Sequence, residues 1–348
     1  MKLSKFDFKL PDSFVAKYPT EKRDESRLMV VNRAKKKITH HSFKNIPSFF
    51  KAGDTLVLNN TRVLAGQIDG YKEKTSANVI MILLRELDPE NRLWDVCVEP
   101  SRKIRVGNKI CIEDDLVVEV IDNTTSRCRT VKFCFQGSNQ ELHDILKEIG
   151  KPPLPAIIGR KLEPIDSQRY QTVYATELGS VVAPAAGFHF TKYILKYLEL
   201  KGINIAEITI HLGLNTLSSL NTEDLIKCRI HTEPFCISKH TADQVNNSMK
   251  NEKKICAVGT STLKALESSV SGSQNLRPQE KAWTSMFITP PYQTKIANSL
   301  LTNFHIPKSI DFINTLAFGG HELMMHAYEV AKKENYRFSF YGDACLII

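Results

Sequence analysis

Residues 78–99 read NVIMILLRELDPENRLWDVCVE, which is two β-rich runs, Asn78–Leu84 and Leu93–Glu99, separated by the turn Asp88-Pro89-Glu90. Branched and aromatic side chains favour strands, and proline beside acidic residues favours a turn. Three more runs of this kind follow within a few tens of residues: Lys109–Ile112, Leu116–Ile121 and Thr130–Phe135. Closely spaced strands with short turns predict a compact antiparallel sheet or small barrel.

The pattern changes to mixed helix and strand on both sides of this block. Thr191 is placed to N-cap a helix over residues 192–201, and the strand-like run Ile203–Leu212 follows directly. Ile255–Val258 predicts a short strand that leads through Gly259-Thr260-Ser261-Thr262 into a helix. Further expected elements are a helix over 140–149, a helix over 263–270, a strand over 287–289 and a helix over 321–334.

We therefore expect an α/β main domain with an inserted antiparallel β-barrel-like domain. The main domain takes residues 1–62 and 150–348, and the insertion takes residues 63–149. An insertion of this kind creates a cleft between two bodies, where ligands commonly bind.

Composition predicts a cytoplasmic protein with no membrane association. The chain has 348 residues, of which 42% are hydrophobic and 24% charged, and its apolar runs are far shorter than the roughly 20 residues of a membrane span. Charges near Met1 occupy the place of a signal peptide's apolar core. The eight cysteines contain no Cys-x-x-Cys pair, so we expect free thiols, mostly in strands.

The net charge of +9 is concentrated near the N-terminus. Residues 1–51 hold 13 Lys and Arg against 5 Asp and Glu, a balance of +8. A local positive field attracts polyanions such as nucleic acid. A basic surface also serves solubility, so charge alone leaves both interpretations open.

Several familiar catalytic devices are missing from the sequence. There is no Gly-x-Gly-x-x-Gly dinucleotide fingerprint, no phosphate loop ending in Gly-Lys, no Gly-x-Ser-x-Gly nucleophile elbow and no cysteine triplet for an iron–sulfur cluster. The chemistry must come from other groups.

Polar clusters at the ends of apolar runs are the remaining candidates. His189, His211, His231 and His305 each lie at a predicted strand end or in a loop, although a single histidine in an apolar setting is more often a satisfied core residue. Residues 259–262 stand before a helix, where backbone N–H groups receive a carboxylate or phosphate; a plain N-cap is the alternative. Arg169 with Tyr170 suits a phosphate and a stacked base, or simply an exposed helix start.

Taken in order, these segments resemble the S-adenosylmethionine:tRNA ribosyltransferase-isomerase family of queuosine biosynthesis. The resemblance covers essentially the whole chain and depends on many short matches in sequence order. They are Tyr18-Pro19, Arg23–Leu28, Asn59–Val63, Arg169–Ala175, Ala183–Thr191, Leu301–Ser309, Tyr336–Phe338 and Tyr341–Ala344.

The resemblance implies an α/β domain interrupted by a β-barrel-like domain, and it implies a reaction. The ribosyl part of S-adenosylmethionine is transferred and isomerised onto 7-aminomethyl-7-deazaguanine at the tRNA wobble position. Epoxyqueuosine results, and adenine and methionine leave. S-adenosylmethionine is then a co-substrate, with no bound cofactor and no metal. The partner is the tRNA anticodon stem-loop, and we expect a monomer.

Roles follow from the same resemblance and from the chemistry of the side chains. A sulfonium acidifies the neighbouring ribose C–H bonds, so a modest base suffices, and aromatic faces suit the sulfonium cation. The expected catalytic groups are His189, His211, His231, Glu233 and His305. Expected S-adenosylmethionine-binding residues are Asn60, Arg62, Tyr170, Gly187, Phe188, Gly259, Thr260, Ser261 and Phe304. Expected tRNA-binding residues are Arg23, Arg27, Arg169, Gln171 and Lys308.

The chain departs from the family pattern at a few positions. Family members usually carry Thr where this chain has Ala185 or Ala186, Leu at Phe188, a Gly-Thr-Phe or Gly-Asn-Phe triplet at Asn215–Leu217, and a hydroxyl residue at Ile310. Two other functions therefore stay open. An S-adenosylmethionine-dependent RNA methyltransferase would release S-adenosylhomocysteine, and a non-catalytic tRNA-binding paralogue would bind RNA without needing S-adenosylmethionine.

Overall fold

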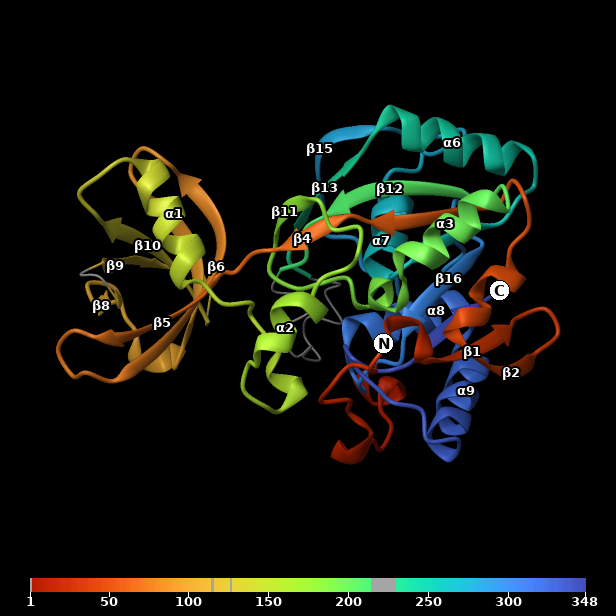
Figure 1. The fold of residues 1–348 in the computed structure, drawn as a ribbon, viewed down its shortest axis with the longest axis horizontal. Coiled ribbons are helices and arrows are strands. Elements are labelled where there is room, and N and C mark those ends of the chain that lie inside the picture. The colour runs from red at the N-terminus through yellow and green to blue at the C-terminus, as the bar shows by residue number, and fades with distance from the viewer. Residues whose placement is uncertain (1, 114–115, 126, 214–229) are drawn as a thin grey trace.

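The computed structural model describes residues 2–113, 116–125, 127–213 and 230–348. Figure 1 shows a small β-barrel beside a larger body in which helices flank a twisted sheet. The barrel is drawn from a continuous stretch of chain, whereas the larger body contains both termini. An α/β main domain with an inserted antiparallel barrel is therefore confirmed as the fold class.

A mixed sheet forms the centre of the larger body. In the described part of the chain it has nine strands in the order β15 (Gln279–Thr284), β13 (Glu233–Ile237), β12 (Asn204–Ile210), β3 (Thr55–Asn59), β14 (Ile255–Val258), β16 (Ser299–Asn303), β17 (Ala344–Ile347), β1 (Arg27–Asn32) and β2 (Lys37–Ser42). The four central strands β12, β3, β14 and β16 run parallel, so their carboxyl ends meet at one edge. That edge is the usual place for ligands in sheets of this type.

Strand β3 is buried on both faces, which explains its continuous apolar sequence. Leu56 and Leu58 pack on one face with the helix α3 (Lys192–Leu200). Val57 points to the other face, which is covered by α6 (Lys239–Lys250), α7 (Thr260–Ser268), α8 (Ile310–Gly319) and α9 (His321–Lys333).

Several sequence-based predictions of local structure can be compared directly with these elements. Thr191 does cap α3, because its hydroxyl accepts the Ile194 N–H at 3.1 Å. The strand expected over 287–289 is wrong: β15 ends at Thr284, and no ladder includes Phe287 or Ile288 in the described structure. Ile288 is instead buried by packing in the core, just before two prolines that cannot donate to a sheet.

The barrel closes from six strands in the order β10 (Cys128–Cys134), β7 (Leu93–Glu99), β6 (Asn78–Asp88), β5 (Gln67–Lys72), β8 (Lys109–Cys111) and β9 (Val117–Asn123), counted over the described residues. The helix α1 (Asn139–Ile149) packs Leu142 and Leu146 into the barrel core. Its first turn has a capping box formed by Ser138 and Glu141.

The chain enters and leaves the barrel at neighbouring points. Gln67 and Lys151 exchange two backbone hydrogen bonds of 2.9 Å each, one in each direction. Gly150 lies so close to this crossing that a Cβ atom there would stand 1.9 Å from the Ala65 carbonyl oxygen. Beside the crossing, β4 (Thr61–Val63) pairs in parallel with β11 (Glu177–Ser180). Both connections are thus fixed to each other and to the larger body.

The remaining described helices are short. They are α2 (Pro164–Arg169) and the 3₁₀ turns Leu3–Phe6, Asp12–Phe14, Arg23–Glu25, Phe43–Phe49, Ser101–Lys103, Ala156–Ile158 and Ala185–His189. Across the described ranges, the helices lack the combination of length and apolar character needed to cross a bilayer.

The cysteines follow the prediction from sequence as far as they are described. Seven are free thiols, and each lies in a strand: Cys97, Cys111, Cys128, Cys134, Cys236, Cys256 and Cys345. Cys228 falls outside the described residues.

Candidate active site

A cavity of about 670 Å³ opens at the carboxyl ends of β14 and β16. Its walls come from three segments that are far apart in the sequence: residues 183–186, residues 259–264 and residues 302–311. Arg127 reaches the same cavity from the barrel. Its volume lies within the range of about 300–1,000 Å³ that is typical of small-molecule sites. We call it the first cavity.

The start of α7 lines one side of the first cavity. Gly259 has φ +98°, a left-handed conformation that lets the chain turn sharply from β14 into the helix. Thr260 and Ser261 then present the helix N-terminus, where backbone N–H groups and the helix dipole favour a negative charge. The Thr260 hydroxyl donates to the Asp311 carboxylate at 2.7 Å, so an acidic group stands directly beside this N-terminus.

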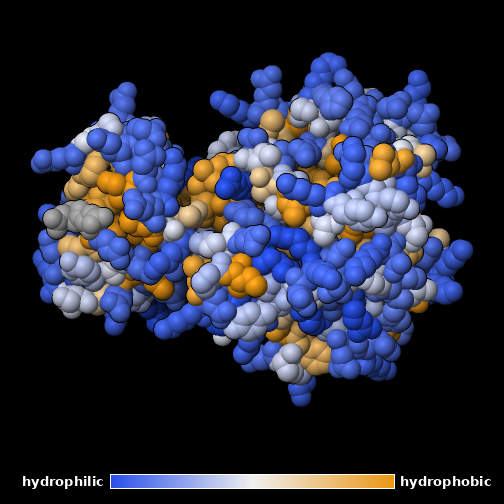
Figure 2. All heavy atoms as spheres, in the orientation of Figure 1, coloured by the Kyte–Doolittle hydropathy of each residue, from blue (hydrophilic) through white to orange (hydrophobic). Residues whose placement is uncertain are grey.

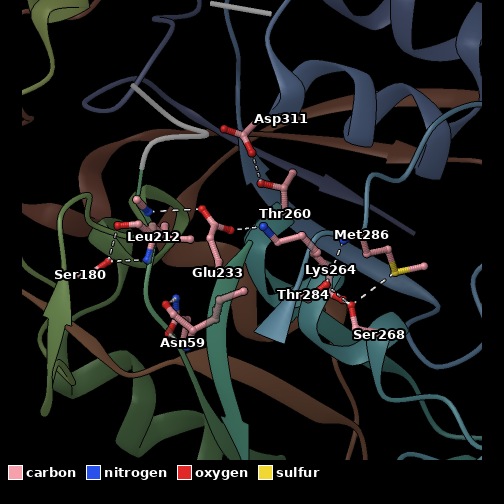
Figure 3. A network of polar contacts seen from close by, with 12 residues as sticks. Asn59, Ser180, Leu212, Glu233, Thr260, Lys264, Ser268, Thr284, Met286 and Asp311 are labelled. Atoms are coloured by element: carbon pink, nitrogen blue, oxygen red, sulfur yellow. Dashed lines mark hydrogen bonds and ion pairs between the residues drawn. The ribbon is translucent and has the colours of Figure 1, made fainter. Parts of the chain in front are cut away.

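An ion pair is buried one helical turn further along. Lys264 on α7 contacts the carboxylate of Glu233, the first residue of β13, and the two residues are only 5% and 2% exposed. Figure 3 shows Glu233 reaching in the other direction toward the backbone that follows Leu212, where the Gly213 N–H donates to it at 3.3 Å. Burying two charges is costly unless they are paired. A pair that also lines a cavity is therefore a strong candidate for function.

His305 is the histidine of the first cavity. Its Nε2 lies 2.7 Å from the Thr302 hydroxyl, and its backbone N–H donates to the Tyr328 hydroxyl at 3.1 Å. Burial lowers the pKa of His305 below its ordinary value of 6.5, and the negative charge of Asp311 offsets only part of this shift. The ring is therefore neutral at pH 7 and able to accept a proton.

A second cavity, of about 550 Å³, lies between the barrel and the larger body. His211 and His231 line it, together with barrel residues. The Nδ1 of His211 lies 2.7 Å from the Thr61 hydroxyl, and burial lowers the pKa of His211. Leu212 and Glu233 line both cavities, so the two share a wall.

His189 lies elsewhere: it borders neither cavity and is 4% exposed. Asn303 donates from its amide nitrogen to two carbonyls, so its Oδ1 must accept from the His189 Nε2–H at 3.0 Å. The His189 Nδ1 then accepts from the Ser26 hydroxyl at 2.7 Å. Burial lowers the pKa of His189 to about 4. This is a neutral, fully bonded core histidine that holds Asn303, a residue of the first cavity.

The aromatic residues expected to face the sulfonium are packed in the interior. Tyr170 and Phe304 are fully buried, Phe188 is 6% exposed, and none of the three is among the residues lining either cavity. Gly187 is pressed against Thr172 and Tyr174, so it serves close packing. Apart from His305, the aromatic residue that lines the first cavity in the described part of the chain is Phe340.

Most of the side chains expected to contact RNA or nucleotide instead contact other parts of this protein. Arg23 and Arg169 donate to backbone carbonyls, and burial lowers the pKa of Arg23 to about 10. Arg27 stacks over Tyr336, with 3.8 Å from its Cζ to the ring centroid. The Gln171 side chain exchanges hydrogen bonds with the Val63 backbone.

Of the remaining expected residues, one reaches a cavity. Lys308 lines the first cavity, where its Nζ lies 2.6 Å from Asp7. Asn60 bonds to Glu207 and Thr209. Arg62 is exposed on β4, away from the residues that line either cavity.

The departures from the family pattern fall in three places, and one of them, Phe188, is buried away from both cavities. Ala185, Ala186 and Ile310 all line the first cavity. Asn215 and Leu217 lie outside the described residues.

Sequence reasoning assigned no role to several residues that line the cavities, among them Lys264, Asp311, Phe340 and Trp283. Of these four, only Lys264 could have been noticed in the sequence. Lys264 and Glu267 interrupt the apolar run of α7, and every residue from Thr262 to Glu267 is buried. A lysine in such a run must have an internal partner.

Figure 2 shows the barrel and the larger body as two masses, with hydrophilic residues covering much of the visible face of the larger body. Within the described ranges, the chain has no grouping of three or more His, Cys, Asp or Glu side chains suited to a metal ion.

Comparisons with known proteins identify the family of this chain. A family model described as "Queuosine biosynthesis protein" matches residues 3–347. The S-adenosylmethionine:tRNA ribosyltransferase-isomerase of Flavobacterium psychrophilum is 51% identical over 350 residues, and that of Cytophaga hutchinsonii is 50% identical over 349, each match covering both chains completely. The crystal structure of the S-adenosylmethionine tRNA ribosyltransferase from Thermotoga maritima is 28% identical, with a TM-score of 0.55 over 99% of this chain and 100% of that one.

Proposed function

The chain belongs to the queuosine biosynthesis protein family, and on this premise we propose that it is an S-adenosylmethionine:tRNA ribosyltransferase-isomerase. It transfers and isomerises the ribosyl part of S-adenosylmethionine onto 7-aminomethyl-7-deazaguanine at the tRNA wobble position. Epoxyqueuosine-tRNA forms, with release of adenine and methionine. One observation carries the proposal: three distant segments, two of which also carry the family resemblance, line one cavity.

The finer assignments belong to the same proposal. S-adenosylmethionine is a co-substrate, no cofactor is permanently bound, and the partner is the anticodon stem-loop. The enzyme is a cytoplasmic monomer.

The first cavity suits the amino-acid end of S-adenosylmethionine. An α-carboxylate fits the N–H groups at Thr260 and Ser261, because a helix N-terminus favours anions. The neighbouring Asp311 carboxylate is placed to receive the α-ammonium group, since it already accepts from Thr260 at that position. A zwitterion is thus matched by opposite charges on adjacent elements. The face of Phe340 supplies an attractive surface for the sulfonium.

His305 and Glu233 are the acid–base groups that this cavity offers. The sulfonium acidifies the adjacent ribose C–H bond, and a neutral His305 accepts a proton more readily than a charged one. Departure of adenine requires a proton or a hydrogen bond at its ring, which Lys264 or a protonated histidine supplies. Lys264 also holds the carboxylate of Glu233 in place.

His211 and His231 are placed on the far side of Glu233, in the second cavity. The incoming aminomethyl group must lose a proton before its nitrogen attacks. Burial lowers the pKa of His211, which favours the neutral ring that this step needs.

The direct test is to incubate the protein with S-adenosylmethionine and an anticodon stem-loop carrying 7-aminomethyl-7-deazaguanine. We expect the RNA mass to rise by one ribosyl-derived unit, with adenine and methionine released in equal amounts. Release of S-adenosylhomocysteine would identify a methyltransferase instead. RNA binding that is independent of S-adenosylmethionine, with no product, would identify a non-catalytic paralogue.

A pair of variants separates the catalytic contribution of the ion pair from its structural one. Lys264→Met leaves the Glu233 carboxylate buried without its partner, so we expect the free energy of unfolding to fall by about 3–5 kcal/mol. The double variant Lys264→Met/Glu233→Leu removes both charges, and we expect most of that stability to return. Its turnover should nevertheless stay below 1% of wild type, because the cavity has lost both groups. Denaturant unfolding and adenine release measure the two effects, and an active double variant would contradict the assigned roles.

A further inference from the structure

The second cavity is separate from the first but shares a wall with it. Leu212 and Glu233 border both, while the remaining lining residues differ. A group transferred across Glu233 would pass from one cavity to the other. The proposed reaction has two substrates, S-adenosylmethionine and the RNA base, and two adjoining cavities can bind one each.

Both tryptophans of the chain line the second cavity, one from each body. Trp94 comes from β7 of the barrel and is 8% exposed. Trp283 comes from β15, where it pairs across the sheet with Pro234, the residue after Glu233. Trp283 is therefore one residue away from Thr284, which pairs with Glu233 of the shared wall.

Trp283 is unusually open for so large an apolar side chain, with 55% of its surface exposed. The guanidinium of Arg85, on barrel strand β6, stands 5.7 Å from its ring centroid. For comparison, the distance from the guanidinium carbon to the ring centroid is only 3.8 Å in the pair of Arg27 and Tyr336. Arg85 thus faces the indole without covering it closely. A flat ligand finds here the two groups, an aromatic ring and a guanidinium plane, on which extruded RNA bases stack.

The polar groups of this cavity include hydrogen-bond acceptors from both bodies. Glu86 and Asp95 come from the barrel and Glu233 from the larger body. Arg85 is bound to Asp95 by contacts of 2.9 and 3.0 Å, and Glu86 accepts from Asn139 at 3.2 Å. Carboxylates accept hydrogen bonds only, so they suit a base edge rich in N–H donors, as a guanine-type base has, or a positively charged amine.

We propose that the second cavity receives the target nucleobase, extruded from the anticodon loop, with Trp283 as its stacking face. This inference rests on the proposed function and adds to it the place of the RNA base. S-adenosylmethionine occupies the first cavity, and Glu233 stands between the sulfonium ribose and the aminomethyl nitrogen. The barrel contributes half of the base site, which gives the insertion a direct part in recognising RNA.

The test uses Trp283 as its own reporter. The variant Trp94→Phe leaves Trp283 as the sole tryptophan of the chain. We expect its fluorescence to be quenched when a stem-loop carrying 7-aminomethyl-7-deazaguanine binds. A stem-loop with an abasic site at that nucleotide should bind through its backbone and quench little. Equal quenching by both RNAs would overturn the proposal.

Kinetics give a second, independent readout. Trp283→Ala removes the stacking face, so we expect the KM for the stem-loop to rise about 5- to 100-fold while the KM for S-adenosylmethionine stays within twofold. Trp283→Phe should restore most of the RNA affinity. Tyr193→Ala is the matched control, because Tyr193 is a 76% exposed aromatic on α3 that borders neither cavity.

Failure of this inference differs from failure of the proposed function. A wild-type enzyme that releases adenine, combined with a Trp283→Ala variant of unchanged RNA KM, would refute the base site alone. A wild-type protein that leaves the RNA mass unchanged would refute the function.

Discussion

A histidine at a strand end can serve the fold or the chemistry, and the bonding of its two ring nitrogens distinguishes these roles. His189, His211 and His305 look alike in the sequence, and each has a hydroxyl partner within 2.7 Å. His189 uses its second nitrogen as well and lies away from both cavities. Sequence alone could find these histidines but could not sort them, because the partners of His189 are 163 and 114 residues away.

The low pKa of His189 makes a testable prediction about stability. Its pKa is about 4 in the folded chain against an ordinary 6.5, so between these pH values the unfolded state binds more protons. Stability therefore rises with pH across this window and is fully present above about pH 6.5. The expected loss on going from pH 7 to pH 4 is about 3 kcal/mol from this residue.

Denaturant unfolding at several pH values measures the effect. His189→Gln should flatten the slope between pH 4 and pH 6.5, whereas His240→Gln, at an exposed position on α6, should leave it unchanged. Equal slopes for wild type and His189→Gln would show that His189 does not carry this pH dependence.

Lys264 illustrates what residue-level reading misses. On a helix, a single lysine among apolar residues is normally assigned to solvent. Its burial depends on Glu233, 31 residues earlier on another element, and on the packing of α7 against the sheet. Local sequence marks Lys264 as unusual but does not identify Glu233 as its partner.

At the scale of elements, the turn residues between the strands allowed most strands of the barrel to be predicted from the sequence. Each predicted strand of the barrel corresponds to an observed strand, with ends displaced by a few residues, because proline, glycine and asparagine mark the turns between them. The one false strand, over 287–289, had the right composition but no neighbouring strand to pair with. Strand propensity is a statement about fitting into a sheet, and the sheet is a long-range property.

The crossing of the two chain connections makes a prediction at this scale. Gly150 has an ordinary φ of −68°, so only space forbids a side chain there. Gly150→Ala places a Cβ against the Ala65 carbonyl and forces the backbone apart. We expect the free energy of unfolding to fall by about 1–3 kcal/mol or more. Hydrogen exchange at the Gln67 and Lys151 amides should become faster.

Gly272→Ala is the matched control for this change. Its position has no heavy atom within 4 Å of an added Cβ, and it lies in an exposed turn. We expect a change below about 0.5 kcal/mol. If both variants lose the same stability, close approach at Gly150 is not the cause.

At the scale of the whole molecule, the sequence predicted two bodies and a site between them, but it could not predict two adjoining cavities. Their existence depends on the order of the nine strands, which brings β13, β14 and β16 to one edge, and on the barrel loop that carries Arg127 across the gap. The concentration of charge in residues 1–51 was visible in the sequence, yet Arg23 and Arg27 are used within the fold.

Arg127 supplies the prediction for this scale, because it places a cation from the barrel in the cavity of the larger body. We expect Arg127→Ala to weaken stem-loop binding and to reduce the slope of log K against log salt by about 0.7–0.9, the loss of one phosphate contact. Arg102→Ala, at an exposed barrel position away from both cavities, should leave the slope unchanged. Binding isotherms from 50 to 300 mM KCl, on the order of physiological ionic strength, measure both.

The paired backbones of Gln67 and Lys151 have a consequence for protein engineering. Because the outgoing and returning segments are already hydrogen-bonded to each other, we expect the segment between Gln67 and Lys151 to be removable as a unit. Its deletion leaves two neighbouring ends that a short linker can rejoin. We expect the same junction to accept a barrel transplanted from a relative. Chimaeras made there would exchange one wall of the second cavity and, in the first cavity, only Arg127.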